Sequence, residues 1–283
     1  MSKLSAPLKG LIKAPFAKPD TTTAPSNIRS VYEKIAHEAS SKNVGLPYWL
    51  TISTAATMTM NSPNALTELY RLATSSKGNK ESASTAEFMR EIGLKCISFN
   101  GIPRTINCLG PFRASLPGDV VQSLSTKTTR VPTKENIDEI KDRGDKLWQS
   151  IYVPFDEKLT AKLGESHPDL PIYIISYHYG ALLADPDRGD LPKVDRVLTS
   201  VVAVACLRAQ TGVGPQVTSH LFGLRKAFEQ GTGLEPAEKE DQGARWLASN
   251  EGSIWILETV DKIVEAIGQG QGTTFAPGIR SKL

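Results

Sequence analysis

Apolar residues recur along most of the chain at the spacing of amphipathic α-helices. In residues 27–41, Ile28, Val31, Tyr32 and Ile35 fall at positions i, i+3, i+4 and i+7, which places them on one helical face. Further helices are predicted wherever a proline or a capping residue opens an apolar segment. They cover residues 49–60, 63–73, 85–96, a segment that opens at Pro103, and residues 134–151, 154–163, 168–183, 193–210, 214–230 and 251–267. No pair of strands is indicated, so the predicted fold class is all-α.

A weak internal repeat suggests how these helices are organised. Residues 63–72 align with residues 215–224 at an offset of 152, and the proline, leucine and aromatic positions coincide. Two unrelated amphipathic helices that both open at proline would also look alike, so duplication and chance both stay open. The preferred interpretation is two degenerate repeats in one chain. The predicted segments are a disordered basic arm (1–26), a first repeat (27–115), a linker (116–133), a second repeat (134–268) and a flexible tail (269–283).

Composition and charge argue against several classes of function. The chain has 283 residues, of which 40% are hydrophobic, so it can build a large core, but it has no apolar run of about 18 residues that would predict a membrane span. Its net charge is +3, and the basic residues are scattered without interleaved aromatics, so nucleic-acid binding is not expected. Three cysteines, Cys96, Cys108 and Cys206, form no Cys-x-x-Cys pair, which argues against a disulfide framework and a zinc site. We expect reduced thiols, no metal and no cofactor.

The two ends of the chain resemble targeting signals. The last three residues, Ser281, Lys282 and Leu283, match the tripeptide that peroxisomal import receptors read, so we expect binding to such a receptor and a location in the peroxisomal matrix. Residues 1–19 contain lysines and no acid, which faintly resembles a mitochondrial presequence. Three prolines interrupt any amphipathic helix there, so a disordered basic arm is preferred and minor mitochondrial targeting stays an alternative.

Motifs in the second half follow one another in a recognisable order. Residues 177–186 carry an aromatic–glycine turn, residues 195–199 an arginine at a helix start, and residues 215–224 a helix that bears a histidine. In the first half, residues 99–107 carry a Phe-Asn-Gly-Ile-Pro signature. Together these motifs resemble those of the carboxymuconolactone decarboxylase family, which belongs with the alkylhydroperoxidase-D-like proteins. The resemblance implies an alkylhydroperoxidase-D-like helical fold that assembles into homo-oligomers, and hence a homodimer or larger assembly of this chain.

Departures from the family pattern narrow the chemistry that the resemblance implies. Alkylhydroperoxidase-D-like peroxidases use a glutamate, a Cys-x-x-Cys pair and a histidine. Counted back from His220, those positions hold Val201, Val213 and Gln216. A peroxidase of the Cys-x-x-Cys type is therefore not expected, unless Cys206 has been recruited alone.

The decarboxylase branch of the family needs no cysteine, and its histidine is matched by His220. An imidazole suits general acid/base chemistry, so His220 is the candidate catalytic residue. The family's Arg-Pro-Gly-Leu segment has Asp185 in place of its arginine, and this loss of a cation weakens the case for a carboxylate substrate. Arg188 and Arg196 remain as candidate substrate-binding cations. Tyr179 is a further candidate for contact with the substrate.

Two functions from different classes stay open. The first is a lyase-, isomerase- or decarboxylase-like enzyme that acts on a small organic acid or acyl compound with His220 as acid or base. The second is a non-catalytic oligomeric binding or assembly protein whose active site has decayed, in which His220 is a core or interface histidine. We expect a structural role for His178. Cys96 and Cys108 form a redox pair or, more usually for such residues, two buried thiols.

Overall fold

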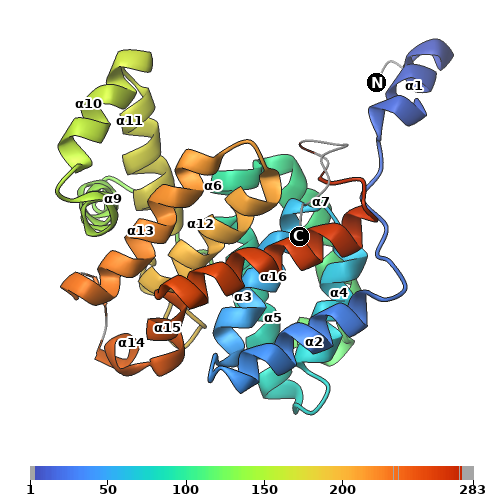
Figure 1. The fold of residues 1–283 in the computed structure, drawn as a ribbon. Helices are drawn as coiled ribbons and strands as arrows, with labels where there is room; N and C mark the ends of the chain where they lie inside the picture. The colour runs from blue at the N-terminus through green and yellow to red at the C-terminus, as the bar shows by residue number, and fades with distance from the viewer. Residues whose placement is uncertain (1–3, 232, 235, 274, 276–283) are drawn as a thin grey trace.

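The computed structural model describes residues 4–231, 233–234, 236–273 and 275, and every regular element within them is a helix (Figure 1). The predicted all-α class is therefore confirmed. The helices are α1 (Ala6–Ile12), α2 (Ile28–Ser41), α3 (Leu46–Thr59), α4 (Pro63–Ala73), α5 (Asn79–Lys95), α6 (Ile97–Asn100), α7 (Ile102–Ser115), α8 (Gly118–Ser123), α9 (Ile137–Tyr152), α10 (Asp156–Ser166), α11 (Leu170–Ile172), α12 (Arg196–Gln210), α13 (Gly214–Gln230), α14 (Pro236–Glu240), α15 (Gln242–Leu247) and α16 (Asn250–Gly268), with a 3₁₀ turn at Pro15–Ala17 (η1) and a π-helix at Tyr173–Leu183 (η2). Within the described residues, no helix is both long and apolar enough to span a membrane.

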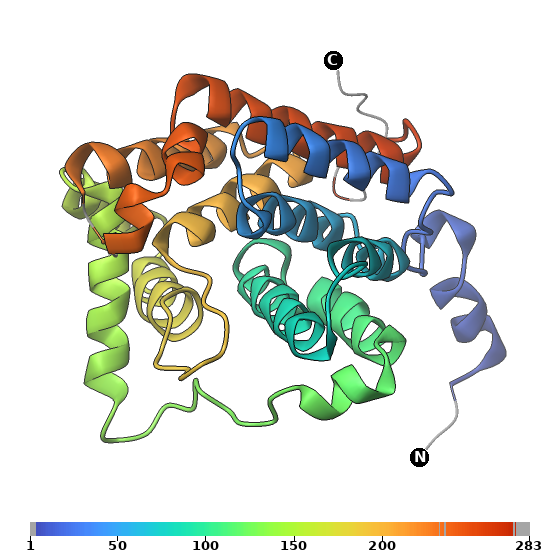
Figure 2. The ribbon, with the colours of Figure 1, turned by 90° about the horizontal axis from the view of Figure 1, so that it is seen from below.

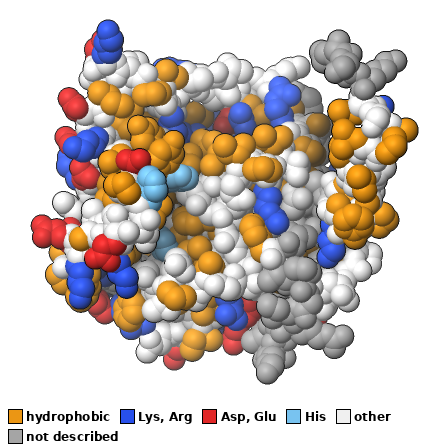
Figure 3. Space-filling view, turned by 90° about the horizontal axis from the view of Figure 1, so that it is seen from above, with side chains coloured by type: hydrophobic (Ala, Val, Ile, Leu, Met, Phe, Trp, Pro, Cys, Tyr) orange, Lys and Arg blue, Asp and Glu red, His pale blue; other side chains and the backbone are white. Residues whose placement is uncertain are grey.

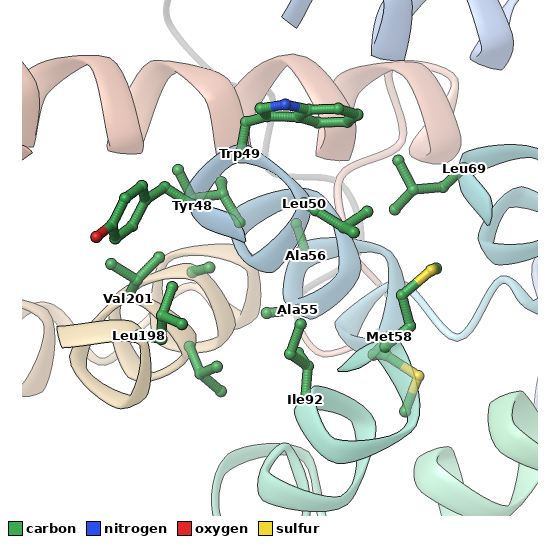
Figure 4. Packing of buried hydrophobic residues seen from close by; sticks show 14 of the residues in the cluster. Tyr48, Trp49, Leu50, Ala55, Ala56, Met58, Leu69, Ile92, Leu198 and Val201 are labelled. Carbon is green, nitrogen blue, oxygen red and sulfur yellow. The ribbon is translucent and has the colours of Figure 1, made fainter. Parts of the chain in front are cut away.

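Helices α3 and α12 form the centre of the molecule and pack against each other. Every residue of α3 from position 48 to 59 is buried, so this helix is covered on all sides, as expected for a core helix with small and apolar residues all round. Figure 4 shows Leu198 and Val201 of α12 on one side of α3, Ile92 of α5 on another, and Trp49 reaching toward α16. The core therefore joins the two halves of the chain.

The order of helices after α3 and α12 is similar. Each is followed by a helix with a proline in its first turn: α4 opens at Pro63, and α13 carries Pro215 at its start. A proline has no N–H to donate, and this costs nothing in the first turn, where the N–H groups lack helical partners. The order fits a duplicated unit, and the duplication stays a prediction.

Three segments outside the two predicted repeats differ from expectation or lie outside the described residues. In the predicted disordered arm, residues 6–12 form α1, because Pro7 stands in the first turn and the Ser5 hydroxyl accepts a hydrogen bond from the Leu8 N–H at 3.4 Å. The predicted linker contains α8 at its start. The predicted import tripeptide, residues 281–283, lies outside the described residues.

Helix α9 and the π-helix η2 approach each other through glycines. A Cβ atom at Gly144 would lie 2.4 Å from the Ile175 carbonyl oxygen, and one at Gly180 would lie 2.4 Å from the Ile140 carbonyl oxygen. Only glycine permits this contact. Around it, Trp148, Ile151, Tyr179 and Leu183 form a second, smaller apolar cluster. Figures 1 and 2 show α9 and its neighbours at one side of the molecule, next to α13.

Candidate functional site

His220 lies near the middle of α13 with its ring surrounded by aromatic side chains. It is buried, with only 7% of its surface exposed. The Phe99 ring of α6 meets it edge-on at a centroid distance of 6.0 Å, and the Tyr152 ring of α9 does so at 6.3 Å. Three separate helices therefore meet at this imidazole. Figure 3 shows histidine side chains among hydrophobic ones on the face seen from above.

Tyrosines link His220 to the π-helix. The hydroxyl oxygens of Tyr152 and Tyr179 are 3.0 Å apart and share a hydrogen bond. Trp148, one turn before Tyr152 on α9, packs against both rings, with centroids 4.1 Å from Tyr152 and 5.2 Å from Tyr179. These contacts depend on the close packing of α9 against η2 at Gly144 and Gly180, because this packing brings the two tyrosines within reach of each other.

Arg196, the first residue of α12, supplies a buried positive charge next to His220. Its guanidinium donates to the Ser150 hydroxyl at 2.9 Å, to the Ser150 carbonyl at 3.2 Å, to the Gly223 carbonyl at 2.9 Å and to the Ser200 hydroxyl. Gly223 lies one helical turn after His220, so the guanidinium stands beside the imidazole. All four acceptors are neutral oxygens, and the negative charges of the nearby Asp195 and Glu238 favour the charged form of the guanidinium. We call His220, Tyr152, Tyr179, Trp148, Phe99 and Arg196 the His220 cluster.

The environment keeps most of the His220 cluster in its neutral form. Burial and the positive charge of Arg196 lower the pKa of His220 to about 4, so its imidazole is uncharged at neutral pH. Burial raises the pKa of Tyr152 and raises that of Tyr179 well above its ordinary value, so both phenols keep their protons. Burial also lowers the pKa of Arg196 to about 10, which still leaves it charged at neutral pH. The net charge of the cluster is thus the single charge of Arg196.

Two polar groups of the His220 cluster have no hydrogen-bond partner among the described residues. These are Nδ1 of His220 and Nε1 of Trp148, and both atoms are buried. An unsatisfied buried polar group costs about 1–3 kcal/mol, so most such groups in folded proteins are paired. One ring nitrogen and one indole N–H are therefore unsatisfied among the described residues.

The structure brings three of the four candidate residues together. Tyr179 and Arg196 lie with His220 in the cluster, whereas Arg188 lies elsewhere, with Nη2 3.2 Å from the Glu91 carboxylate. Arg130 also pairs with Glu91, so Arg188 belongs to a buried ion-pair network. The same network includes Asp185, whose carboxylate lies 3.8 Å from Nη2 of Arg130.

Asp185 faces a buried amine rather than the His220 cluster. Its carboxylate oxygen lies 2.8 Å from Nζ of Lys95, a side chain with no exposed surface. Lys95 also donates to the Thr199 hydroxyl at 3.1 Å and to the Val194 carbonyl at 2.5 Å. An acid at position 185 therefore balances a buried charge on α5, and an arginine there would add to it.

Sequence reasoning missed Tyr152, Trp148, Ser150 and Phe99. The first three lie on α9, where positions 148, 151 and 152 follow the i, i+3, i+4 pattern of one helical face. That pattern indicates which residues face inward but not what they contact. Their link to His220 depends on how α9 packs against η2 and α13.

The remaining candidate residues show little sign of reactivity. All three cysteines are free and buried, and Sγ of Cys96 lies 3.5 Å from Sγ of Cys206. Burial raises the pKa of Cys96, and it raises that of Cys108 to about 12, so neither thiol is activated as a thiolate. His178 shares a hydrogen bond of 3.0 Å with the Ser98 hydroxyl, which gives it a partner in the first half of the chain. The described residues contain no group of three side chains suited to hold a metal.

A comparison with known proteins gives one curated relative. The chain is 30% identical over 162 residues to a protein of Saccharomyces cerevisiae (strain ATCC 204508 / S288c) named "Peroxisomal protein 2". The match covers 49% of this chain and 53% of the relative, so it spans about half the length of each. No family model matches the chain. No solved structure matches it either. The similarity supports a relationship to a peroxisomal protein.

Proposed function

We propose that this chain is a peroxisomal protein. The name of the yeast relative supports this location, and the tripeptide Ser281-Lys282-Leu283 fits the signal that peroxisomal import receptors read. The test compares two fluorescent fusions in yeast, one with residues 281–283 and one without them. The full chain is expected in peroxisomes and the shortened chain in the cytosol. A diffuse signal from the full chain would refute the assignment.

We further propose that the His220 cluster carries out acid/base chemistry on a small organic acid or acyl compound. The observation that carries this proposal is a buried imidazole with an unpartnered Nδ1 beside an arginine whose hydrogen-bond partners are all neutral. Arg196 balances the negative charge of an acid or of a developing enolate, and His220 takes or returns the proton. Tyr179 and Tyr152 position the substrate through their hydroxyls. The family resemblance points to a decarboxylase, isomerase or lyase.

A Cys-x-x-Cys peroxidase does not fit the arrangement around His220. The residues at the family's cysteine positions, Val213 and Gln216, carry no thiol. Cys206 lies on the buried α12, and its sulfur lies 3.5 Å from that of Cys96, whose pKa is raised by burial. A peroxide would meet no thiolate beside His220.

One observation favours a second candidate, a binding or assembly protein without catalysis. A general base works best when its pKa lies near the working pH, and the pKa of His220 is about 4. Among the described residues, moreover, no carboxylate is hydrogen-bonded to its ring. In this alternative the cluster binds an anion and leaves it unchanged.

Proton exchange in D₂O distinguishes the two candidates. Wild-type protein is incubated with 3-oxo acids, lactone carboxylates and short acyl thioesters, and loss of the proton next to the carbonyl is followed by NMR. We expect exchange with at least one class, reduced about a hundredfold or more in His220→Gln. The exposed His167 provides the matched control, since His167→Gln should leave the rate unchanged. Equal rates in wild type and His220→Gln for every probe would leave the binding function as the better account.

We also propose a homodimer or larger assembly, because the family that the chain resembles associates through its helices. Light scattering at micromolar concentration measures the mass directly. A mass near 30.7 kDa, that of one chain, would refute the proposal.

A further inference from the structure

A groove runs along the outer side of α13 where the α9–α10 connection and α10 face it. Its volume is about 620 Å³, within the range of sites that hold small organic molecules. The walls are mostly apolar. Phe155 and Phe222 face it with 68% and 64% of their surfaces exposed, unusually high values for phenylalanine. The other apolar lining residues are Ile151, Val153, Pro154 and Leu159.

The rim of this groove is basic. Lys158, Lys162, Arg225 and Lys226 line it against one acid, Glu229, which gives a net charge of +3 from four cations and one anion. Lys158 and Lys162 stand one turn apart on α10, and neither takes part in any ion pair formed by the described residues. We call this site the basic groove.

The basic groove adjoins the His220 cluster. Tyr152 lines the groove, and the same ring meets the His220 ring edge-on. Ser219, which precedes His220 on α13, lines it as well. Ile151 lies in its floor, where its Cγ2 atom would be 2.8 Å from a Cβ atom at Gly223, so α9 and α13 are in close contact there. A molecule in the groove would lie against the outer side of the cluster.

We propose that the basic groove binds an acyl chain that carries an anionic head group. The apolar walls cover the chain, and Lys158 and Lys162 neutralise the head. A free fatty acid and an acyl thioester of a phosphate-bearing carrier share this chemistry. The inference goes beyond the proposed function, because neither His220 nor Arg196 lines the groove. Binding itself does not depend on His220.

Direct binding measurements test the basic groove. The probes are dodecanoate, dodecanoyl coenzyme A and the neutral dodecanol, measured by equilibrium dialysis with the full chain. We expect one or both anionic probes to bind, and dodecanol to bind about tenfold more weakly or worse. The affinity of the anionic probes should fall as the salt concentration rises, because salt screens the charges of exposed lysines. Dodecanoate alone would indicate a carboxylate head, and the thioester alone would indicate recognition of phosphates.

Matched variants locate the binding. The double charge reversal Lys158→Glu/Lys162→Glu should weaken binding of the anionic probes about tenfold or more, whereas Lys141→Glu/Lys146→Glu, on exposed positions of α9, should not. Phe222→Ser should weaken it similarly, with Ile106→Ser, at an equally exposed position of α7, as the control. Each changed residue is solvent-exposed, so the fold is expected to survive, and circular dichroism checks this.

His220→Gln separates this inference from the proposed function. That variant should bind the anionic probes within about threefold of wild type while losing proton exchange. If the wild type binds the probes without catalysing proton exchange, the proposed catalysis is refuted and the proposed binding site is supported. Failure of both anionic probes to bind, binding only to vesicles of anionic phospholipid, or unchanged binding in the groove variants would each overturn the inference.

Discussion

Replacing His220 with glutamine should make the protein less sensitive to acid. In the wild type the imidazole has a pKa of about 4 when folded, against an ordinary value of 6.5 when unfolded. Above pH 6.5 neither state binds the proton, so His220 has no pH-dependent effect. As the pH falls from 6.5 toward 4, the unfolded chain binds a proton that the folded chain does not, so stability is lost.

The size of this effect follows from the pKa shift. Each unit is worth about 1.4 kcal/mol, and at pH 4.5 most of the shift from 6.5 to about 4 has taken effect. The wild type should therefore lose about 2–3 kcal/mol more than His220→Gln between pH 7 and pH 4.5. Asp195 acts in the opposite direction, because burial and the charge of Glu238 raise its pKa to about 7. Its stabilisation is present at low pH and is lost as the pH rises from 4 to 7. Both proteins share this contribution, so it cancels in the comparison.

Urea unfolding at several pH values measures the difference. The free energy of unfolding is obtained for wild type, His220→Gln and the exposed control His167→Gln from pH 4.5 to 7. NMR titration of the four histidines then gives the pKa of His220 directly. Parallel stability curves for wild type and His220→Gln, or a measured pKa within half a unit of 6.5, would refute the neutral buried imidazole on which the site description rests.

Two further substitutions and one labelling experiment test the packing of the chain. Gly180→Ala should lower the free energy of unfolding in urea by about 3 kcal/mol, because its Cβ atom would lie 2.4 Å from the Ile140 carbonyl oxygen. The control Gly164→Ala, where nothing lies within 4 Å of the added Cβ atom, should be neutral or stabilising. Equal effects of the two substitutions would contradict the glycine contact. Asp185→Asn should cost about 3–5 kcal/mol by leaving Lys95 buried without its counter-charge, with Asp187→Asn as the exposed control. The three buried thiols should react with an aromatic disulfide reagent only as the protein unfolds. Fast reaction in native buffer would show that at least one of Cys96, Cys108 and Cys206 is accessible.

The sequence predicted the helices better than the contacts between them. Helix α2 at Ile28–Ser41 agrees closely with the predicted 27–41, because the spacing of apolar residues is a local signal. The π-helix at Tyr173–Leu183 was predicted only as part of an ordinary helix, since its apolar residues show no distinctive period. Likewise, Cys96 and Cys206 are far apart in the chain, and their 3.5 Å contact follows from the packing of α12 beside α5 and α6.

The candidate site divides in the same way. Tyr179, Arg196 and His220 were found because motifs along the chain carry them. Tyr152 was not found, because its place depends on the approach of α9 to η2 through Gly144 and Gly180. Two glycines 36 positions apart on different helices give no pattern that a single sequence reveals. Sequence reasoning therefore misses residues such as Tyr152, whose neighbours are set by the packing of helices that are far apart in the chain.

The charge of Arg196 matters for both candidate functions, catalysis and anion binding, because it affects the pKa of His220. Burial and this charge together hold the pKa of His220 at about 4, too low for an efficient base at neutral pH. An anionic ligand beside Arg196 would offset the charge, and its own negative charge would favour the protonated imidazole. Binding of the anion would thus raise the pKa of His220 toward the range in which it exchanges protons readily. The low pKa of the free protein is consequently compatible with catalysis when the bound substrate carries a negative charge.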